Sequence, residues 1–118
     1  MSYQKVIILG AVGKDPEVRR VADRAVASFS VATSETYKDK NGQRKEVTEW
    51  HNISMWDKAA EFVEKYVKKG STVFIEGKIK TRDYEDKNGN KRYVTEIVSN
   101  TIQLVGNKKK ENNDDLPY

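Results

Sequence analysis

The chain has 118 residues, of which 36% are hydrophobic and 34% are charged, so it can build one small domain with a modest core. It contains no cysteine and one histidine, which excludes disulfides and thiolate metal sites. No apolar run reaches the length of a membrane span and no signal-peptide core follows Met1, so we expect a cytoplasmic protein. Residues 1–110 carry 22 Lys and Arg against 15 acids, a net +7, which favours a polyanionic partner.

The first part of the chain predicts short buried strands. Residues 6–9 form an apolar run that ends at Gly10, and residues 13–16 contain the Gly and Pro of a turn. A second strand is predicted over residues 26–33, with one face made of Ala27, Phe29 and Val31. We expect that face to join the core.

Two long hairpins are predicted, over residues 37–56 and 84–104. Each contains an Asn-Gly pair, at residues 41–42 and 88–89, which is a strong signal for a two-residue turn. The residues around both turns are polar and basic, with too few apolar side chains to bury themselves. We therefore expect both hairpins to project from the domain as arms.

One helix is predicted between the hairpins, over residues 57–69. Asp57 is a suitable N-cap and Gly70 is a suitable terminator. Apolar residues at helical spacing form a single stripe, which consists of Ala59, Phe62, Val63, Tyr66 and Val67. A small barrel needs a plug at its end, so we expect this stripe to pack against the core rather than against a partner.

The strand predicted at residues 49–56 places two tryptophans on its polar side. Successive side chains of a strand point to opposite faces, so Ile53 and Met55 take the core face. Trp50 and Trp56 take the other face, which is otherwise polar. A flat aromatic surface in such a position is what an unpaired nucleobase stacks on.

Residues 73–84 repeat this pattern with charge added. The odd positions supply a core face of Val73, Ile75 and Ile79. The even positions supply the other face, which carries Phe74, Glu76, Lys78, Lys80, Arg82 and Tyr84. Cations neutralise phosphates and rings receive bases, as a groove for single-stranded nucleic acid requires. The alternative is a solvated face with an aromatic fitted against a neighbour. Because the same pattern occurs on two strands, the binding face is favoured.

The sequence does not indicate an enzyme. The one histidine, His51, lies on the core-facing side of its strand, where a buried or interfacial hydrogen bond outweighs a catalytic role. Residues 10–14 lack the spacing of a phosphate-binding loop. Nothing suggests a paired nucleophile and base or a metal-ligand cluster, so we expect a binding module with no cofactor and no metal.

The composition changes after residue 105. Residues 106–113 contain no hydrophobic side chain, so we expect a short disordered linker. The chain then combines two acids with apolar groups and a carboxylate, which is typical of a short peptide that binds a basic-rimmed apolar pocket on another protein. This predicted tip consists of Asp114, Asp115, Leu116, Pro117 and Tyr118.

Several motifs follow one another along the chain. They are GxxGxDPEVR at residues 10–19, AVAxFSVAT at 25–33, TEWH at 48–51, YVKKGS at 66–71, FIEG at 74–77, KTR at 80–82 and RYVTEI at 92–97. Together they closely resemble the bacterial-type single-stranded DNA-binding proteins. The resemblance implies an all-β OB-fold domain over residues 1–105: a five-stranded Greek-key barrel with one α-helix and long hairpin arms, assembled as a homotetramer on single-stranded DNA.

The resemblance also implies roles for individual residues. Base stacking falls to Tyr37, Trp50, Trp56 and Tyr84. Phosphate contacts fall to Lys5, Arg19, Lys58, Lys69, Lys80 and Arg82, to which the charge pattern adds Lys78. His51 matches a position near the subunit interface.

The expected function is sequence-tolerant binding and protection of single-stranded DNA in replication, recombination and repair, at the nucleoid, with partner enzymes recruited through the tip. Two alternatives stay open. One is an RNA-binding OB-fold protein, because stacking platforms accept both nucleic acids. The other is an oligomeric scaffold that acts mainly through its tail.

Overall fold

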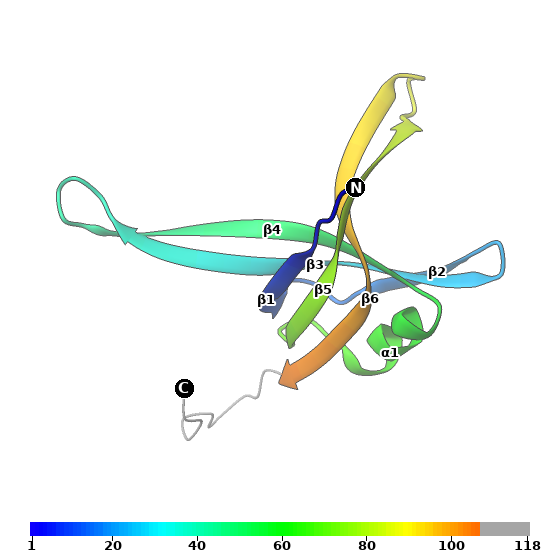
Figure 1. The fold of residues 1–118 in the computed structure, drawn as a ribbon, viewed down its shortest axis with the longest axis horizontal. Helices are drawn as coiled ribbons and strands as arrows, with labels where there is room; N and C mark the ends of the chain where they lie inside the picture. Colours follow the sequence, from blue (N-terminus) through cyan, green and yellow to red (C-terminus); the bar gives the residue numbers. More distant parts are fainter. Residues whose placement is uncertain (107–118) are drawn as a thin grey trace.

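The computed structural model describes residues 1–106, which form six strands and one helix. In chain order these are β1 (Val6–Val12), β2 (Glu17–Val21), β3 (Arg24–Lys38), β4 (Arg44–Trp56), α1 (Lys58–Tyr66), β5 (Thr72–Glu85) and β6 (Lys91–Gly106). The sheet has the strand order β1-β5-β6-β4-β3-β2, and an additional pairing of β1 with β3 closes five of the strands into a barrel (Figure 1). The strand β2 pairs with β3 outside this closed ring.

The connectivity of the barrel is that of an OB-fold. Strands β4 and β6 pair in parallel, whereas the pairs β1–β5, β5–β6, β3–β4 and β1–β3 are antiparallel. The predicted five-stranded barrel with one helix is therefore confirmed. The predicted linker after residue 106 and the predicted tip lie outside the described residues.

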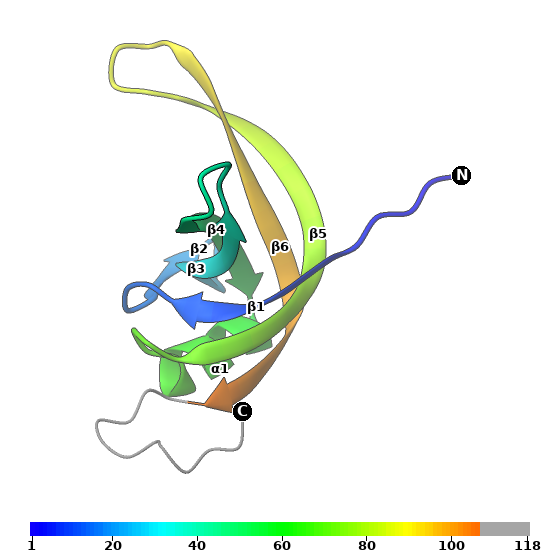
Figure 2. The same ribbon diagram turned by 90° about the vertical axis from the view of Figure 1, so that its left-hand side faces the viewer.

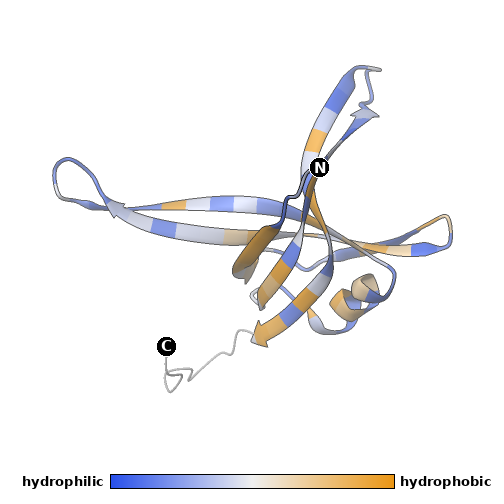
Figure 3. Ribbon diagram, in the orientation of Figure 1, coloured by the Kyte–Doolittle hydropathy of each residue, from blue (hydrophilic) through white to orange (hydrophobic). Residues whose placement is uncertain are grey.

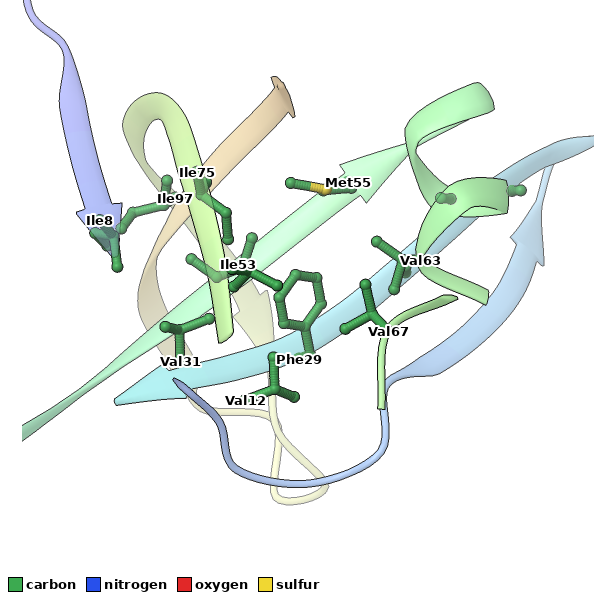
Figure 4. Packing of buried hydrophobic residues seen from close by; sticks show 14 residues of the cluster. Ile8, Val12, Phe29, Val31, Ile53, Met55, Val63, Val67, Ile75 and Ile97 are labelled. Carbon is green, nitrogen blue, oxygen red and sulfur yellow. The ribbon is translucent and has the colours of Figure 1, made fainter. Parts of the chain in front are cut away.

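The core fills the barrel and is built from alternating strand positions. As predicted, β3 contributes Ala27, Phe29 and Val31, while β4 contributes Ile53 and Met55. Phe29 lies near the middle of this cluster (Figure 4). Because neighbouring residues of a strand point the opposite way, the same strands present a second set of side chains on the outside of the barrel.

An irregularity in the β5–β6 pairing lies where the pairing of β5 with β1 ends. Gly77 lies opposite Ser99 but Glu76 lies opposite Thr101, so Asn100 is an extra residue on β6. The Ser99 hydroxyl lies within hydrogen-bond distance of the backbone oxygens of Glu76 and Thr101, and it accepts the Thr101 N–H. Beyond the part of β6 that pairs with β4, residues 97–99, β5 and β6 curve away from the barrel as an arm (Figure 2).

The prediction that Ile79 belongs to the core is wrong. Val73 and Ile75 are fully buried, but Ile79 on the same side of β5 is 47% exposed. The reason is that β5 pairs with β1 only as far as Gly77, so no strand of the barrel covers this edge of β5 at Ile79. There the Gln4 side chain accepts the Ile79 N–H at 3.0 Å and donates to the Ile79 carbonyl at 3.3 Å, so the N-terminal segment runs along this edge.

The helix α1 packs on the barrel core but is shorter than predicted. It ends at Tyr66 because Val67 adopts an extended conformation. Its core side consists of Ala60, Val63 and Val67, with Phe62 partly buried beside them. Tyr66, which the predicted stripe included, is exposed and lies with its ring centroid 5.0 Å from that of Phe62. The expectation of core packing therefore holds for most of the stripe.

The sequence pattern does not predict β2. This strand joins β3 through a two-residue turn at Ala22 and Asp23, whose φ angles are 49° and 67°. Such turns favour Gly and Asn, so the absence of glycine hid the turn. Strand β3 begins at Arg24 and continues to Lys38. The strand predicted at residues 26–33 and the first limb of the first arm are thus one strand.

The two arms end in loops of matching geometry, but these are not the two-residue turns that the sequence predicts. Each loop has five residues, 39–43 and 86–90. Gly42 and Gly89 have φ angles of 80° and 78°, whereas the asparagines before them do not reach the positive φ of a type I′ turn. Asp39 and Asp86 each accept two backbone N–H groups of their loop at 2.9 Å. Both arms project as expected, and their ribbons are mostly hydrophilic (Figure 3).

Gly10 lies where the barrel closes. A Cβ on Gly10 would lie 2.2 Å from the backbone oxygen of Ala32 and 2.9 Å from Val31 Cγ1. The pairing of Ala11 with Ala32 holds β1 against β3 at this point. The first glycine of the GxxGxDPEVR motif therefore serves barrel closure rather than ligand binding.

We expect Gly10→Ala to lower the free energy of unfolding by roughly 1–3 kcal/mol, because the backbone at Ala32 must shift to admit the methyl group. The matched control is Gly106→Ala, at the end of β6, where a Cβ has no neighbour within 4 Å. It should change the free energy of unfolding by less than about 0.5 kcal/mol. Urea denaturation at one protein concentration measures both variants. Equal losses in the two would contradict the close crossing.

Candidate nucleic-acid interface

One side of the barrel carries both tryptophans together with the cations of β5. The register places Ser54 of β4 opposite Val98 of β6, and Val98 opposite Lys78 of β5, so these three side chains share a face. We call this surface the outer face; by strand alternation it carries Trp50, Ser54, Trp56, Lys78, Lys80, Arg82, Tyr84, Glu96 and Val98. The two polar strand faces predicted from the sequence are thus one continuous surface.

Trp50 lies with its six-membered ring against Gly13. A Cβ on Gly13 would lie 2.4 Å from Cζ3 and 2.9 Å from Cη2 of the indole. The Gly13 N–H donates to the backbone oxygen of Ser30 at 3.0 Å, which holds the loop in place. Trp50 remains 58% exposed. The loop therefore supports part of the ring and leaves the rest open to a base.

Trp56 lies at the other end of β4 and has a cation on its ring. The guanidinium carbon of Arg24 is 4.6 Å from the ring centroid, which is a cation–π contact. Asp57 holds this arginine through both branches of its fork: Nε donates to Oδ1 at 3.2 Å and Nη2 donates to Oδ2 at 2.7 Å. Trp56 is half-buried, so it is less open than Trp50.

The prediction of Asp57 as the N-cap residue of α1 is confirmed, although its side chain takes no part in the cap. Asp57 stands at the N-cap position, but its carboxylate makes no capping hydrogen bond because it binds Arg24 instead. These hydrogen bonds from Arg24 hold the pKa of Asp57 below its usual value. The backbone of Asp57 has a φ of 59° and a ψ of −122°, outside the left-handed helical region that Asn and Asp tolerate, so residues with a Cβ rarely adopt this conformation.

A groove of about 630 Å³ begins at Trp56. Arg24 and Asp57 line it beside the indole, and Lys5 and Lys78 line it on the side of the N-terminal segment and β5. Val98 of β6 lies between them. The volume falls within the range of about 300–1,000 Å³ that is usual for small-ligand sites. A single nucleotide is therefore an occupant of suitable size.

The three β5 cations of the outer face differ in their partners. Within residues 1–106, no carboxylate forms an ion pair with Lys78 or Lys80. Arg82 Nε donates to Glu96 Oε2 at 3.1 Å, and the Ser54 hydroxyl donates to Glu96 Oε1 at 2.9 Å. The Glu96 side chain is only 14% exposed. The two lysines therefore supply the uncompensated positive charge.

The two predicted tyrosines lie on different faces. Tyr84 continues the even-numbered set of β5 and so lies on the outer face. Tyr37 follows Ala32 by five residues, and Ala32 pairs with Trp50, so Tyr37 lies on the opposite face of the β3–β4 hairpin. Both rings are about half exposed. The outer face thus gathers Trp50, Trp56 and Tyr84 but not Tyr37.

The other predicted phosphate contacts are distributed around this surface. Lys5 lines the groove and pairs with Glu76 at 3.6 Å. Arg19 of β2 lies opposite Val26 of β3, which lies opposite Trp56. Lys58 follows Trp56 by two residues, at the start of α1. Lys69 lies beside the β1–β2 loop, where its N–H donates to Asp15 at 2.9 Å.

His51 faces inward and makes a hydrogen bond, as its position in the strand predicts. Its Nε2 lies 2.8 Å from the Thr33 hydroxyl. The assignment of His51 to a subunit interface stays a prediction. Within the described part of the chain, no three His, Asp or Glu side chains gather to hold a metal ion, and no helix is long and apolar enough to cross a membrane.

Sequence reasoning missed three residues that shape this surface: Gly13, Arg24 and Glu96. Arg24 shares the even-numbered face of β3 with Val26, which pairs with Trp56, but the pairing is visible only once the register is known. Glu96 lies opposite Lys80, and this pairing too is visible only once the register is known. Gly13 belongs to the GxxGxDPEVR motif, but the motif does not indicate that the ring of Trp50 lies against this glycine.

The comparisons with known proteins agree with this geometry. The model of the single-strand binding protein family matches residues 3–105. Two curated proteins named single-stranded DNA-binding protein, from Neisseria meningitidis serogroup A and serogroup B strains, are each 50% identical to the chain; the matches cover 100% of this chain and 68% of each relative.

The solved structure of a Plasmodium falciparum SSB complex with ssDNA superposes with a TM-score of 0.79 and 28% sequence identity, covering 89% of this chain and 96% of that one. The likeness spans the barrel that carries the outer face. Fold, sequence and family match therefore agree that this chain belongs to the single-strand binding protein family.

Proposed function

We propose that this chain binds single-stranded DNA with little sequence preference and protects it during replication, recombination and repair. The observation that carries the proposal is the outer face, where Trp50, Trp56 and Tyr84 lie beside Lys78 and Lys80. Family membership supports it, because proteins of this family bind DNA and are not enzymes. The similar Plasmodium falciparum protein is in complex with single-stranded DNA.

The chemistry of the outer face suits an unpaired strand. Indole rings stack on the face of any base, and they can reach that face only where the base is unpaired. Lys78 and Lys80 are point charges that follow phosphates without reading base edges. Stacking with point charges therefore gives affinity without sequence preference.

We expect Trp50→Ala and Trp56→Ala each to weaken binding to a dT oligonucleotide by roughly tenfold to a hundredfold, the range that base stacking gives in OB-folds of single-stranded DNA-binding proteins. Fluorescence anisotropy measures the affinity, and the same oligomer as RNA tests the alternative ligand. The control is Tyr93→Ala. Tyr93 is exposed and lies opposite Asp83 in the β5–β6 pairing, so it is on the side of this hairpin that faces away from the outer face. Unchanged affinity in both tryptophan variants, or a preference for RNA, would contradict the proposal.

Binding should weaken as salt rises, because the lysines of the outer face displace counterions from phosphates. Each neutralised phosphate contributes about 0.7 to the slope of log affinity against log salt for a single strand. Lys80→Ala should flatten the slope by up to about that amount. Lys65→Ala, an exposed lysine on α1, is the control and should leave the slope unchanged. A parent slope near zero would rule out an electrostatic interface.

We also propose that the protein assembles as a homotetramer. Strand β1 presents Ile7 and Leu9 on its outer side, each 57% exposed, next to the half-buried Phe74 of β5. Val105 near the end of β6 is 50% exposed as well. Figure 3 shows apolar positions on β1 and on the adjoining ends of β5 and β6. Exposed apolar side chains gathered in this way are usual at subunit contacts.

Replacing Leu9 by Asp should therefore reduce the assembly to smaller species, because a charge replaces an apolar contact. Light scattering coupled to gel filtration measures the mass. Val47→Asp is the matched control, since Val47 is 45% exposed but lies on the first arm. A monomeric parent protein would contradict the tetramer, and an intact Leu9→Asp tetramer would contradict this contact.

We further propose that residues 114–118 recruit partner enzymes. The support is sequence alone: two acids can meet basic residues on a partner, and Leu116, Pro117 and Tyr118 can enter an apolar pocket. Deleting residues 114–118 should abolish capture of replication and repair enzymes in pull-down experiments. DNA affinity should stay equal or rise, because acids that compete with phosphates are removed. Retained capture by the truncated chain would refute the assignment.

A further inference from the structure

Arg24 is held in a geometry that a phosphate could supply equally well. Its guanidinium donates two parallel hydrogen bonds to Asp57, at 3.2 and 2.7 Å, and lies 4.6 Å from the ring centroid of Trp56. Carboxylates and phosphates accept this fork in the same bidentate way. A nucleotide whose base lies on Trp56 would bring a phosphate into the region that Asp57 now serves.

The backbone of Asp57 indicates that its carboxylate has a role. A φ of 59° is unstrained for glycine and costs energy for a residue with a Cβ. The side chain makes no helix-capping hydrogen bond and pairs with Arg24 instead. The chain therefore accepts a strained residue at a position where its carboxylate serves the arginine.

We propose that Asp57 takes the place of a DNA phosphate in the free protein, and that Arg24 is a further DNA-binding residue that exchanges Asp57 for a phosphate of the strand stacked at Trp56. This inference rests on the proposed binding of single-stranded DNA. It assigns to Arg24 a contact that neither the sequence pattern nor the family resemblance gives it.

Exposure supports an exchange at this ion pair. The side chains of Arg24 and Asp57 are 55% and 52% exposed, and exposed ion pairs contribute little stability because both ions are hydrated and screened. The Arg82–Glu96 pair on the same face is different, since Glu96 is 14% exposed and also holds Ser54. A phosphate can thus displace Asp57 more readily than Glu96.

The groove provides the matching charge. Besides Arg24 it is lined by Lys5 and Lys78, and its two acids, Asp57 and Glu76, each pair with one of these cations. Once Asp57 is displaced, Arg24 and Lys78 face the same groove as phosphate ligands. A base stacked on Trp56 then lies between the sugar-phosphate backbone of the strand and the barrel.

A double-mutant cycle on the full chain tests the exchange, with affinity for a dT oligonucleotide measured by anisotropy at low salt. Asp57→Asn, which keeps the size of the side chain but removes its charge, should tighten binding by roughly twofold to fivefold because the competitor is removed. Arg24→Ala should weaken binding by roughly tenfold, and Arg24→Lys should lie between it and the parent. In the Arg24→Ala background, Asp57→Asn should give no gain.

Glu76→Gln is the matched control, because it removes one negative charge from the same groove without touching Arg24. Any gain that it gives should persist in the Arg24→Ala background. Asp57→Gly provides a second variant that lacks the carboxylate and relieves the backbone strain, and it should tighten binding in the same Arg24-dependent way.

Three results would overturn the exchange: a weaker Asp57→Asn variant, an Asp57→Asn gain that survives in Arg24→Ala, or an Arg24→Ala affinity equal to that of the parent. Each of these presupposes a parent protein that binds the dT oligonucleotide. A parent that fails to bind would instead refute the proposed function itself, so the two failures are distinguishable.

Discussion

The close crossing of β1 over β3 is the constraint on which the rest of the structure depends. It requires a residue without a side chain at Gly10, and it converts an open sheet into a closed ring. In a closed ring every strand has one set of side chains inside and one outside. The core of Ile53 and Met55 and the outward-facing pair Trp50 and Trp56 are therefore two consequences of a single alternation along β4. A register shift of one residue would exchange them.

The bulge on β6 has a consequence for the interface as well as for the core. It adds a residue to β6, so Ile97 faces inward before it while Ile102 and Leu104 pack against the core after it. Strand β5 receives no extra residue, and its even-numbered side chains keep one face from Lys78 to Tyr84. The line of cations thus continues from the barrel onto the arm without interruption, which suits a ligand as long and regularly charged as a nucleic-acid strand.

Local patterns predicted what depends on one strand at a time, and failed where a second strand decides. The face of Trp50 and the burial of Phe29 follow from period-two alternation and were correct. The exposure of Ile79 depends on where the pairing of β5 with β1 ends, and the Arg24–Trp56 contact depends on register, so neither could be read from one segment. The hairpin of β2 and β3 around Ala22 was not predicted, because a positive φ there has no glycine to indicate a tight turn.

An acidic side chain on a face rich in cations needs a physical explanation, and for Glu96 its low exposure provides one. Glu96 is nearly buried and joins Ser54 of β4 to Arg82 of β5 across β6, so it fixes the shape of the outer face at the cost of one cation's long-range attraction. Attraction at a distance then comes from Lys78 and Lys80, which form no ion pair within residues 1–106 and whose charge acts over a Debye length of about 8 Å. The arginines act at contact, where a planar fork gives geometry that a lysine cannot. In the proposed function the outer face therefore divides two tasks between two kinds of cation: Lys78 and Lys80 would draw the strand in, and the paired arginines would determine where its phosphates lie.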